Sequence, residues 1–377
     1  VAKAERVSKV LSRWARLWRT TQALDEVSTQ SALAPEERRR RAEAVWGPVG
    51  EFMDEFPPTD PSGHAAMLAF AGWARRLEGY PDEGEEWMRR SSALDPDLPY
   101  GALLRAMARF VEYVRLQRLP MVSMGGAGVA FGPARGEDEA CAGLRAEVSA
   151  LLDEAERAAV WGKGEAGVYQ GAIAAVRAMQ AGDYAAADEA LSEAIDAPEL
   201  RPMRTSLLLA RAKARYLKKE FGAALADIED VLALRQGSAE AWGTSGLIRQ
   251  GEAAERGAHK QDPMPSLDRA IGDFGKAIEC APGDVEALLS RAMAYEMKAE
   301  AQTALGLDTL DTLSKAIADL DLAVSIDGQN GYARINRGAA CLGLGEARMA
   351  RGEDATSCYE EAIEDLTQGI ALRPDDV

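Results

Sequence analysis

The sequence predicts an all-α protein, a right-handed α-solenoid built from helical hairpins. A short motif recurs four times at a spacing of 46 residues, and apolar residues within each copy follow helical spacing. A second series of positions, 242, 288 and 334, keeps the same spacing. The four copies of the motif occupy residues 224–228 (ALADI), 270–274 (AIGDF), 316–320 (AIADL) and 362–366 (AIEDL).

Small residues recur four positions after this second series, as Gly246, Ala292 and Gly338. Glycine inside a helix costs about 1 kcal/mol relative to alanine, so its presence needs a compensating contact. Two antiparallel helices approach closely only where one side chain is absent or is a methyl group. We therefore predict that each unit is a helix, a turn and a second helix, packed tightly at these three positions.

Composition and charge limit the class of protein. Hydrophobic residues make up 47% of the 377 residues and charged residues 28%, which suffices for a buried core and a soluble surface. The balance of 44 basic and 61 acidic residues gives a net charge of -17, which repels nucleic acid. No apolar stretch approaches the roughly 18 residues of a membrane span, and no secretory signal is apparent. We expect a cytoplasmic protein that binds no nucleic acid.

Three segments are expected along the chain: an N-terminal helical segment (1–62), irregular hairpins (63–167) and a regular array (168–377). The first is basic, since residues 1–41 carry ten Lys or Arg and five Asp or Glu. We expect this to be the exposed face of an amphipathic helix rather than a lipid-binding segment. Residues 120–136 contain too many glycines for a helix and form an insertion.

Few residues could carry out chemistry. The two histidines, His64 and His259, lie beside no cysteine and in no HExxH spacing. The four cysteines are far apart and indicate a reducing compartment. The Gly-rich insertion lacks the strand before it and the Lys after it that phosphate loops require. Carboxylates such as Asp227 and Asp319 are expected on solvated helix faces. We therefore expect no catalytic residue, no metal and no cofactor.

The later units resemble the tetratricopeptide repeat (TPR) family. Residues 181–184 (AGDY) are similar to the turn and second-helix start of a TPR, and Trp242 and Gly246 match the family's first-helix Trp and Gly. The resemblance implies that Trp242 is a core residue between the helices. Earlier in the chain, Gly72 falls at the close-packing position and Pro96 would end a second helix. The resemblance covers residues 168–377 and, in part, 64–118.

The sequence departs from the family in the length of three units. The units that start near Ala239, Val285 and Gly331 carry about 12 residues more than the family's usual 34. The extra residues fall between the first-helix matches and the second helix, and one such stretch, 256–265, contains two prolines. We expect longer first helices capped by longer loops, all on one edge of the solenoid. This extended edge is expected to bind the partner together with the groove lined by the first helices.

The resemblance implies a protein or peptide partner, because ligands in the family commonly lie along the groove lined by first helices. The groove positions here are mainly apolar and lack the Lys, Asn and Arg residues with which chaperone-binding members hold a C-terminal carboxylate. An apolar or helical partner segment fits better. The implied partner-binding residues are Gly243, Leu247, Gln250, Leu289, Met293, Glu296, Ile335, Ala339 and Leu342.

Other interpretations remain open. An envelope solenoid could close its groove over an apolar small molecule or lipid, and an internal cavity would distinguish it. An enzyme would need clustered polar groups in residues 120–136. The chain begins at Val1 and ends after Pro374 without a polar closing helix, so we expect part of a larger polypeptide. A composition rich in Ala, Arg, Gly and Asp resembles the TPR regions that follow bacterial Ser/Thr kinases, which implies a bacterial signalling role.

Overall fold

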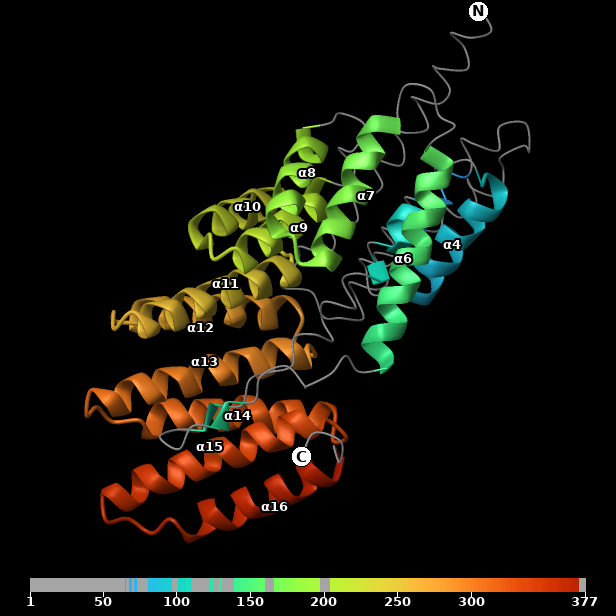
Figure 1. Cartoon of the computed structure of the whole chain (residues 1–377). Coiled ribbons are helices and arrows are strands. Elements are labelled where there is room, and N and C mark those ends of the chain that lie inside the picture. Colours follow the sequence, from blue (N-terminus) through green and yellow to red (C-terminus); the bar gives the residue numbers. More distant parts are fainter. Residues whose placement is uncertain are drawn as a thin grey trace, which may run out of the picture. The chain divides into compact units, whose positions relative to one another are not determined.

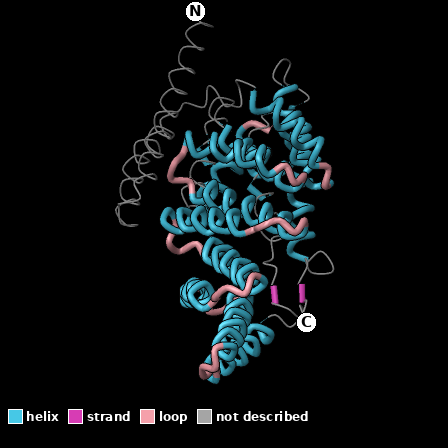
Figure 2. Tube along the Cα trace, turned by 90° about the vertical axis from the view of Figure 1, so that its left-hand side faces the viewer, coloured by secondary structure: helices cyan, strands magenta, loops and turns pink. Residues whose placement is uncertain are grey.

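In the residues that it describes, a computed structural model shows an almost entirely helical protein with one pair of short strands (Figure 2). The chain forms two compact units, and the division falls within one helix, after Ala214. The expected N-terminal segment, residues 1–62, lies outside the described residues. The structure describes residues 65, 68–69, 71–72, 81–96, 101–106, 108–109, 123–124, 129–130, 139–159, 166–196 and 204–372.

The first unit contains helices from the segment of expected irregular hairpins and from the start of the expected regular array. Helix α4 ends just before Asp95 and Pro96, as expected. A Cβ atom on Gly72 would lie 2.6 Å from the carbonyl oxygen of Gly84, so Gly72 is a close-packing position. Gly182, with φ of +75°, makes the predicted turn between two helices. The helices of this unit are α4 (Pro81–Leu94), α6 (Glu139–Ala159), α7 (Ala166–Ala181), α8 (Tyr184–Asp196) and the first part of α9 (Arg204–Leu217).

The Gly-rich insertion contributes two short strands. β1 (Ser123–Met124) pairs with β2 (Val129–Ala130) in antiparallel orientation, with Ser123 opposite Ala130. These residues are not helical, as the glycine content predicts. The rest of residues 120–136 lies outside the described part of the chain.

The second unit contains three long hairpins stacked in sequence order (Figure 1). Their first helices begin at Ala239, Val285 and Gly331, so successive starts differ by 46 residues. Each first helix has 20 residues and each second helix has 17. The helices of these hairpins are α11 (Ala239–Ala258), α12 (Met264–Cys280), α13 (Val285–Ala304), α14 (Leu310–Ile326), α15 (Gly331–Ala350) and α16 (Thr356–Leu372). They are preceded by the shorter helix α10 (Phe221–Leu234), most of which belongs to the same unit.

A polar side chain begins each long first helix. The side chains of Ser238, Asp284 and Asn330 accept hydrogen bonds from backbone N–H groups in the first turns of α11, α13 and α15. Such N-caps satisfy donors that have no partner inside the helix, and each contributes about 1 kcal/mol. Because these three residues are 46 positions apart, the same local chemistry fixes the start of all three helices.

A left-handed residue ends each long first helix. Lys260, Gly306 and Gly352 have φ values of +55°, +68° and +73°. The residue after each donates its N–H to the carbonyl five positions earlier, as Gln261 does to Arg256 at 2.8 Å. This is a Schellman motif, which caps carbonyl groups that the helix leaves without a partner. The chain turns sharply here and starts the second helix after a few residues.

The loop expected over residues 256–265 is shorter in the structure, because most of the extra residues lengthen helices. α11 continues to Ala258 and α12 begins at Met264. Pro265 lies in the first turn of α12, where a missing N–H leaves no hydrogen bond unmade. The shorter hairpin of α9 and α10 has only 14 residues in each helix. Two of the connecting loops do lie side by side, since Arg351 pairs with Asp308 at 2.6 Å.

The predicted close-packing glycines lie against second-helix side chains. A Cβ atom on Gly246 would lie 2.6 Å from the ring of Phe274, and one on Gly338 would lie 2.8 Å from Leu366 Cγ. In the middle hairpin, Ala292 of α13 and its neighbours form a buried cluster with residues of α14 and α15. The small residues therefore allow the two helices of each hairpin to pack at close range, as the sequence predicts.

Candidate partner-binding surface

Each second helix of this unit places one buried aspartate against its first helix. These residues form the fourth position of the repeated motif and are 2%, 8%, 7% and 3% exposed. The expectation that Asp227 and Asp319 lie on solvated faces is therefore wrong. Arg215 donates to Asp227, and Arg291 donates to both oxygens of Asp319 at 2.8 and 2.6 Å. The four aspartates are Asp227, Asp273, Asp319 and Asp365.

Asp273 is held in a different way from its counterparts. The position equivalent to Arg291 is Ser245, whose hydroxyl donates to Asp273 Oδ2 at 2.7 Å. Arg249, one turn further along α11, donates to the same oxygen at 2.7 Å. The buried carboxylate is thus satisfied in every hairpin, as a buried charge requires, although its donors differ.

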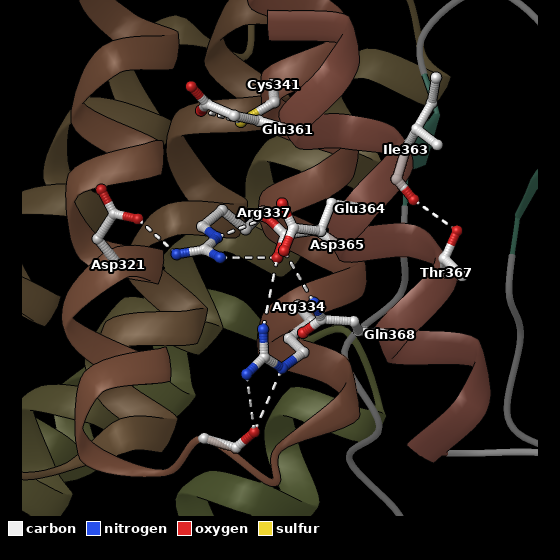
Figure 3. Close-up of polar contacts among 11 residues, drawn as sticks. Asp321, Arg334, Arg337, Cys341, Glu361, Ile363, Glu364, Asp365, Thr367 and Gln368 are labelled. Carbon is white, nitrogen blue, oxygen red and sulfur yellow. Dashed lines mark hydrogen bonds and ion pairs between the residues drawn. The ribbon is translucent and has the colours of Figure 1, made fainter. Parts of the chain in front are cut away.

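Arg337 connects three helices through two carboxylates (Figure 3). Its Nε and Nη2 donate to Asp365 at 2.6 and 2.7 Å, and its Nη1 donates to Asp321 at 2.8 Å. Hydrogen bonding to Asp365 raises the pKa of the guanidinium above its ordinary value. Since Asp321 belongs to α14 and Asp365 to α16, this arginine joins its own hairpin to the preceding one.

The nine residues implied for partner binding lie on α11, α13 and α15, and all are buried or half-buried. Leu289 belongs to the core cluster around Ala292, and Leu247 packs against the cluster that contains Phe274. A Cβ atom on Gly369 would lie 2.6 Å from Ile335 Cγ1, so Ile335 packs closely against α16. Gly243 is different, because the space that a Cβ atom would occupy is open. The set therefore combines hairpin packing with a partly accessible first-helix surface.

Each first helix contributes three of the nine residues, and the third of them is polar in two of the three hairpins. Gln250 Nε2 donates to Met297 Sδ of the next first helix at 3.2 Å. Its counterpart Glu296 is 6% exposed, and Glu296 Oε1 has no hydrogen-bond partner among the described residues. Burial, with a smaller effect of Glu300, raises the pKa of Glu296 to about 8. Glu296 is therefore protonated at neutral pH.

The edge formed by the first-helix ends carries exposed apolar side chains. Leu305 and Leu307 lie in the connection between α13 and α14, and Met349 lies near the end of α15. All three are more than half exposed, at 64%, 53% and 62%. Groups of exposed apolar side chains on a protein surface mark contact sites more often than isolated ones do. The extra length of these units pointed to this edge as a binding surface, although neither helical periodicity nor the resemblance singled out these three side chains.

Trp242 is only half-buried, although it was expected in the core. Lys276 of α12 places its ammonium group 3.9 Å from the centre of the Trp242 ring. A cation over the face of an indole is attracted to it by about 0.5–2 kcal/mol. Trp242 therefore joins the two helices of its hairpin, as expected, but through a face that remains partly in solvent.

The described residues offer little for catalysis. No group of three or more His, Cys, Asp or Glu side chains in the described ranges could hold a metal ion. Cys280, Cys341 and Cys358 are not joined in disulfide bonds, and burial followed by the charge of Glu361 raises the pKa of Cys341 to about 12. A thiol with such a pKa is a poor nucleophile. None of the helices in the described ranges combines the length and apolar composition needed to cross a membrane.

The stacked hairpins define the class of protein: an α-solenoid of TPR-like units. No family model and no curated protein matches the chain. Solved structures with similar hairpins include MamA (residues 41 to the end) from Desulfovibrio magneticus, with 17% identity, a TM-score of 0.39, and coverage of 56% of this chain and 98% of that one. A thermophilic TPR protein of Thermus thermophilus has 17% identity, a TM-score of 0.36, and coverage of 56% and 91%. Yeast Tom70 has 14% identity, a TM-score of 0.39, and coverage of 90% and 60%. At such low TM-scores the similarity carries no information on what this chain binds.

Proposed function

We propose that the chain is a non-catalytic interaction module that binds a segment of a protein partner along the first helices α11, α13 and α15. The observation that carries this proposal is a difference between two kinds of position in the repeats. Positions that hold the fold keep their residue, as Asp273, Asp319 and Asp365 do. Groove positions change in size and polarity from one hairpin to the next, as Gln250 and Glu296 differ from the apolar residue at 342.

Such variation gives the groove a sequence of distinct contacts. From the first hairpin to the third, one row reads Gly243, Leu289 and Ile335, and the next row reads Leu, Met and Ala. A thioether such as that of Met293 adapts to the shape of an apolar segment. A partner helix with apolar side chains on one face could therefore be recognised by its order of large and small residues.

The edge with Leu305, Leu307 and Met349 is the second part of the proposed surface. The ion pair between Arg351 and Asp308 holds two adjacent loops of this edge together. A partner that extends beyond the groove could bury these three exposed side chains. Each would contribute about 1.5–3 kcal/mol if fully buried, before the losses of ordering both molecules.

The test compares two variants of the intact chain in pull-downs from a cell extract, followed by mass spectrometry. Ala339→Arg places a long cation in the half-buried groove row, and Ala318→Arg makes the same change at an exposed position of the second helix α14, outside the groove and the edge. We expect partners captured by the wild type and by Ala318→Arg to be lost with Ala339→Arg. Thermal unfolding of both variants checks that each remains folded. Equal capture by both folded variants would contradict groove binding.

A further inference from the structure

An acid without a hydrogen-bond partner is buried on α13, the first helix of the middle long hairpin. Glu296 is 6% exposed, and its Oε1 has no hydrogen-bond partner among the described residues. Burying a polar oxygen in this way costs free energy, because water no longer binds it and the protein supplies no donor. Glu296 can therefore gain from a ligand a contact that the fold does not provide.

The preceding hairpin shows what the repeat otherwise places at this position. Gln250 of α11 is the counterpart of Glu296, and its Nε2 donates to Sδ of Met297 on the next first helix at 3.2 Å. The counterpart of Met297 on α15 is Gly343, which has no side chain. Between α13 and α15, which contact each other, a carboxyl group thus replaces the amide, and the side chain opposite it is missing.

The space of the missing side chain can take a new group. Outside its own stretch of helix, only Leu313 of α14 would lie within 4 Å of a Cβ atom on Gly343 among the described residues, at ordinary contact distances of 3.6 and 3.7 Å. By contrast, a Cβ atom on Gly338 or Gly345 of the same helix would lie 2.8 Å from a side chain of α16. Helix packing therefore does not require the glycine at 343, and its half-buried backbone reaches solvent.

The charges around Glu296 favour a cation as the missing group. Burial and, to a smaller extent, the exposed Glu300 one turn further along α13 raise the pKa of Glu296, and no described Lys or Arg offsets this shift. On the facing helix, the charged residue closest in sequence to Gly343 is Glu346, which is also acidic. The cations of α11, α13, α14 and α15 all bind other groups: Arg249, Arg256, Arg291, Lys298, Lys315, Arg334, Arg337 and Arg348.

We propose that the junction of α13 and α15 at Glu296 and Gly343 binds a lysine or arginine side chain of the partner segment. This inference rests on the proposed function, and it names the kind of residue that the groove selects. The methylene groups of such a side chain would lie over Gly343 and contact Leu313, while its charged end would reach Glu296. An anionic side chain would meet only negative charge at this junction.

Binding of a cation at this junction should release a proton. In the free protein the pKa of Glu296 is about 8, and a bound cation lowers this pKa because it favours the carboxylate. The bound form then holds one proton fewer than the free form. Affinity should therefore rise with pH, by at most about tenfold per pH unit, and level off above about pH 8. A neutral ligand that needs the protonated acid would show the opposite trend.

The probe for this site is n-butylammonium, which reproduces the end of a lysine side chain. Its binding to the isotope-labelled full chain can be followed by NMR at the Glu296 carboxyl group and the Gly343 amide. We expect a saturable shift of both signals in the millimolar range, with tighter binding at pH 8 than at pH 6. The neutral analogue n-butanol is the control for apolar contact alone, and its binding should not change with pH.

Two variants locate the contact on the chain. Glu296→Gln should weaken binding of n-butylammonium about tenfold or more and remove its pH dependence, since the amide carries no charge. The double variant Glu296→Gln, Gly343→Met recreates the pair formed by Gln250 and Met297, so it should fold and fail to bind. Thermal unfolding checks its fold. Glu229→Gln, at an exposed position on α10, is the matched control and should leave the affinity unchanged.

Three results would overturn the inference: no saturable shift at Glu296 and Gly343, equal binding by the wild type and the folded double variant, or affinity that falls between pH 6 and pH 8. The proposed function would survive each of them, because the pull-down with Ala339→Arg tests groove binding independently of Glu296. Equal partner capture by the wild type and Ala339→Arg, together with n-butylammonium binding at Glu296, would instead contradict groove binding and leave a cation site without a partner segment.

Discussion

Arg249 donates to Asp273 from one helical turn further along its helix than Arg291 does to Asp319. The aspartate occupies the same repeat position in both hairpins, whereas the arginine does not. Ser245 occupies the position equivalent to Arg291 and also donates to Asp273. The two hairpins thus satisfy the same buried charge with different numbers of donor residues. This difference leads to a prediction about which arginine the fold needs more.

Replacing Arg291 by Met should cost about 3–5 kcal/mol, since Asp319 would remain buried without its bidentate partner. Arg249→Met should cost less, about 1–3 kcal/mol, because the Ser245 hydroxyl still donates to Asp273. Hydrogen exchange of α12 and α14 is the suitable measurement, since repeat proteins need not unfold in one step. Lys315→Met, which removes an exposed pair with Asp311, is the control and should change stability by less than about 0.5 kcal/mol. Equal costs at Arg249 and Arg291 would contradict the role assigned to Ser245.

The protonated Glu296 should make stability fall as the pH rises. In the unfolded chain this carboxyl ionises near its ordinary pKa of 4.5, whereas in the fold its pKa is about 8. The fold therefore binds the additional proton between these values, and its free energy of unfolding should drop with increasing pH in this window. One proton corresponds to a slope of at most about 1.4 kcal/mol per pH unit.

Glu296→Gln should remove this slope and make the protein more stable than the wild type at pH 8–9. The repeat-equivalent Gln250 shows that an amide is accommodated at this position. Urea unfolding of both proteins at pH 5, 7 and 9 provides the comparison. Parallel stability curves for the two proteins would mean that Glu296 is ionised in the fold.

Leucine at two helical glycines should have opposite effects. Gly338→Leu should destabilise the last hairpin by about 1–3 kcal/mol, because its Cβ would lie 3.1 Å from the carbonyl oxygen of Ala362 and 2.8 Å from Leu366. Gly272→Leu should stabilise by up to about 1 kcal/mol, since nothing lies near its Cβ position and leucine favours a helix. Melting temperatures of the two variants decide this. An unchanged value for Gly338→Leu would refute the close packing.

The left-handed residues that end the first helices offer a backbone test. Lys260→Gly should raise stability by up to about 1 kcal/mol, because glycine adopts a φ near +55° without strain. Gly306→Lys makes the reverse change at the equivalent position, where nothing surrounds the new Cβ atom, and should cost a similar amount. Thermal unfolding of both variants is sufficient. A destabilised Lys260→Gly would show that the lysine side chain matters more than its backbone conformation.

The fold could be predicted largely from the repeated motif, whereas the length of the loops could not. The spacing of the motif and the small residues at 246 and 338 determine paired helices directly. The loops were misjudged because Pro263 and Pro265 suggested a long break, although proline is well tolerated at a helix start. The signals that fix the ends were present: Ser238 and its two equivalents are good N-caps at the same spacing.

The surface chemistry was harder to predict, because burial of a charge depends on a partner far away in the sequence. Asp319 is buried only because Arg291, 28 residues earlier, reaches it across the hairpin. The repetition of this aspartate in every copy of the motif was the available signal. Glu296 gave no such signal, since its environment comes from packing between hairpins and no local pattern shows it.

The buried thiols of Cys341 on α15 and Cys358 on α16 allow transient opening of this hairpin to be measured without an added probe. A small alkylating reagent can react with them only when these two helices separate, whereas the half-buried Cys280 of α12 is reachable without such a separation. At saturating reagent, the rate of modification would therefore equal the rate at which α15 and α16 separate.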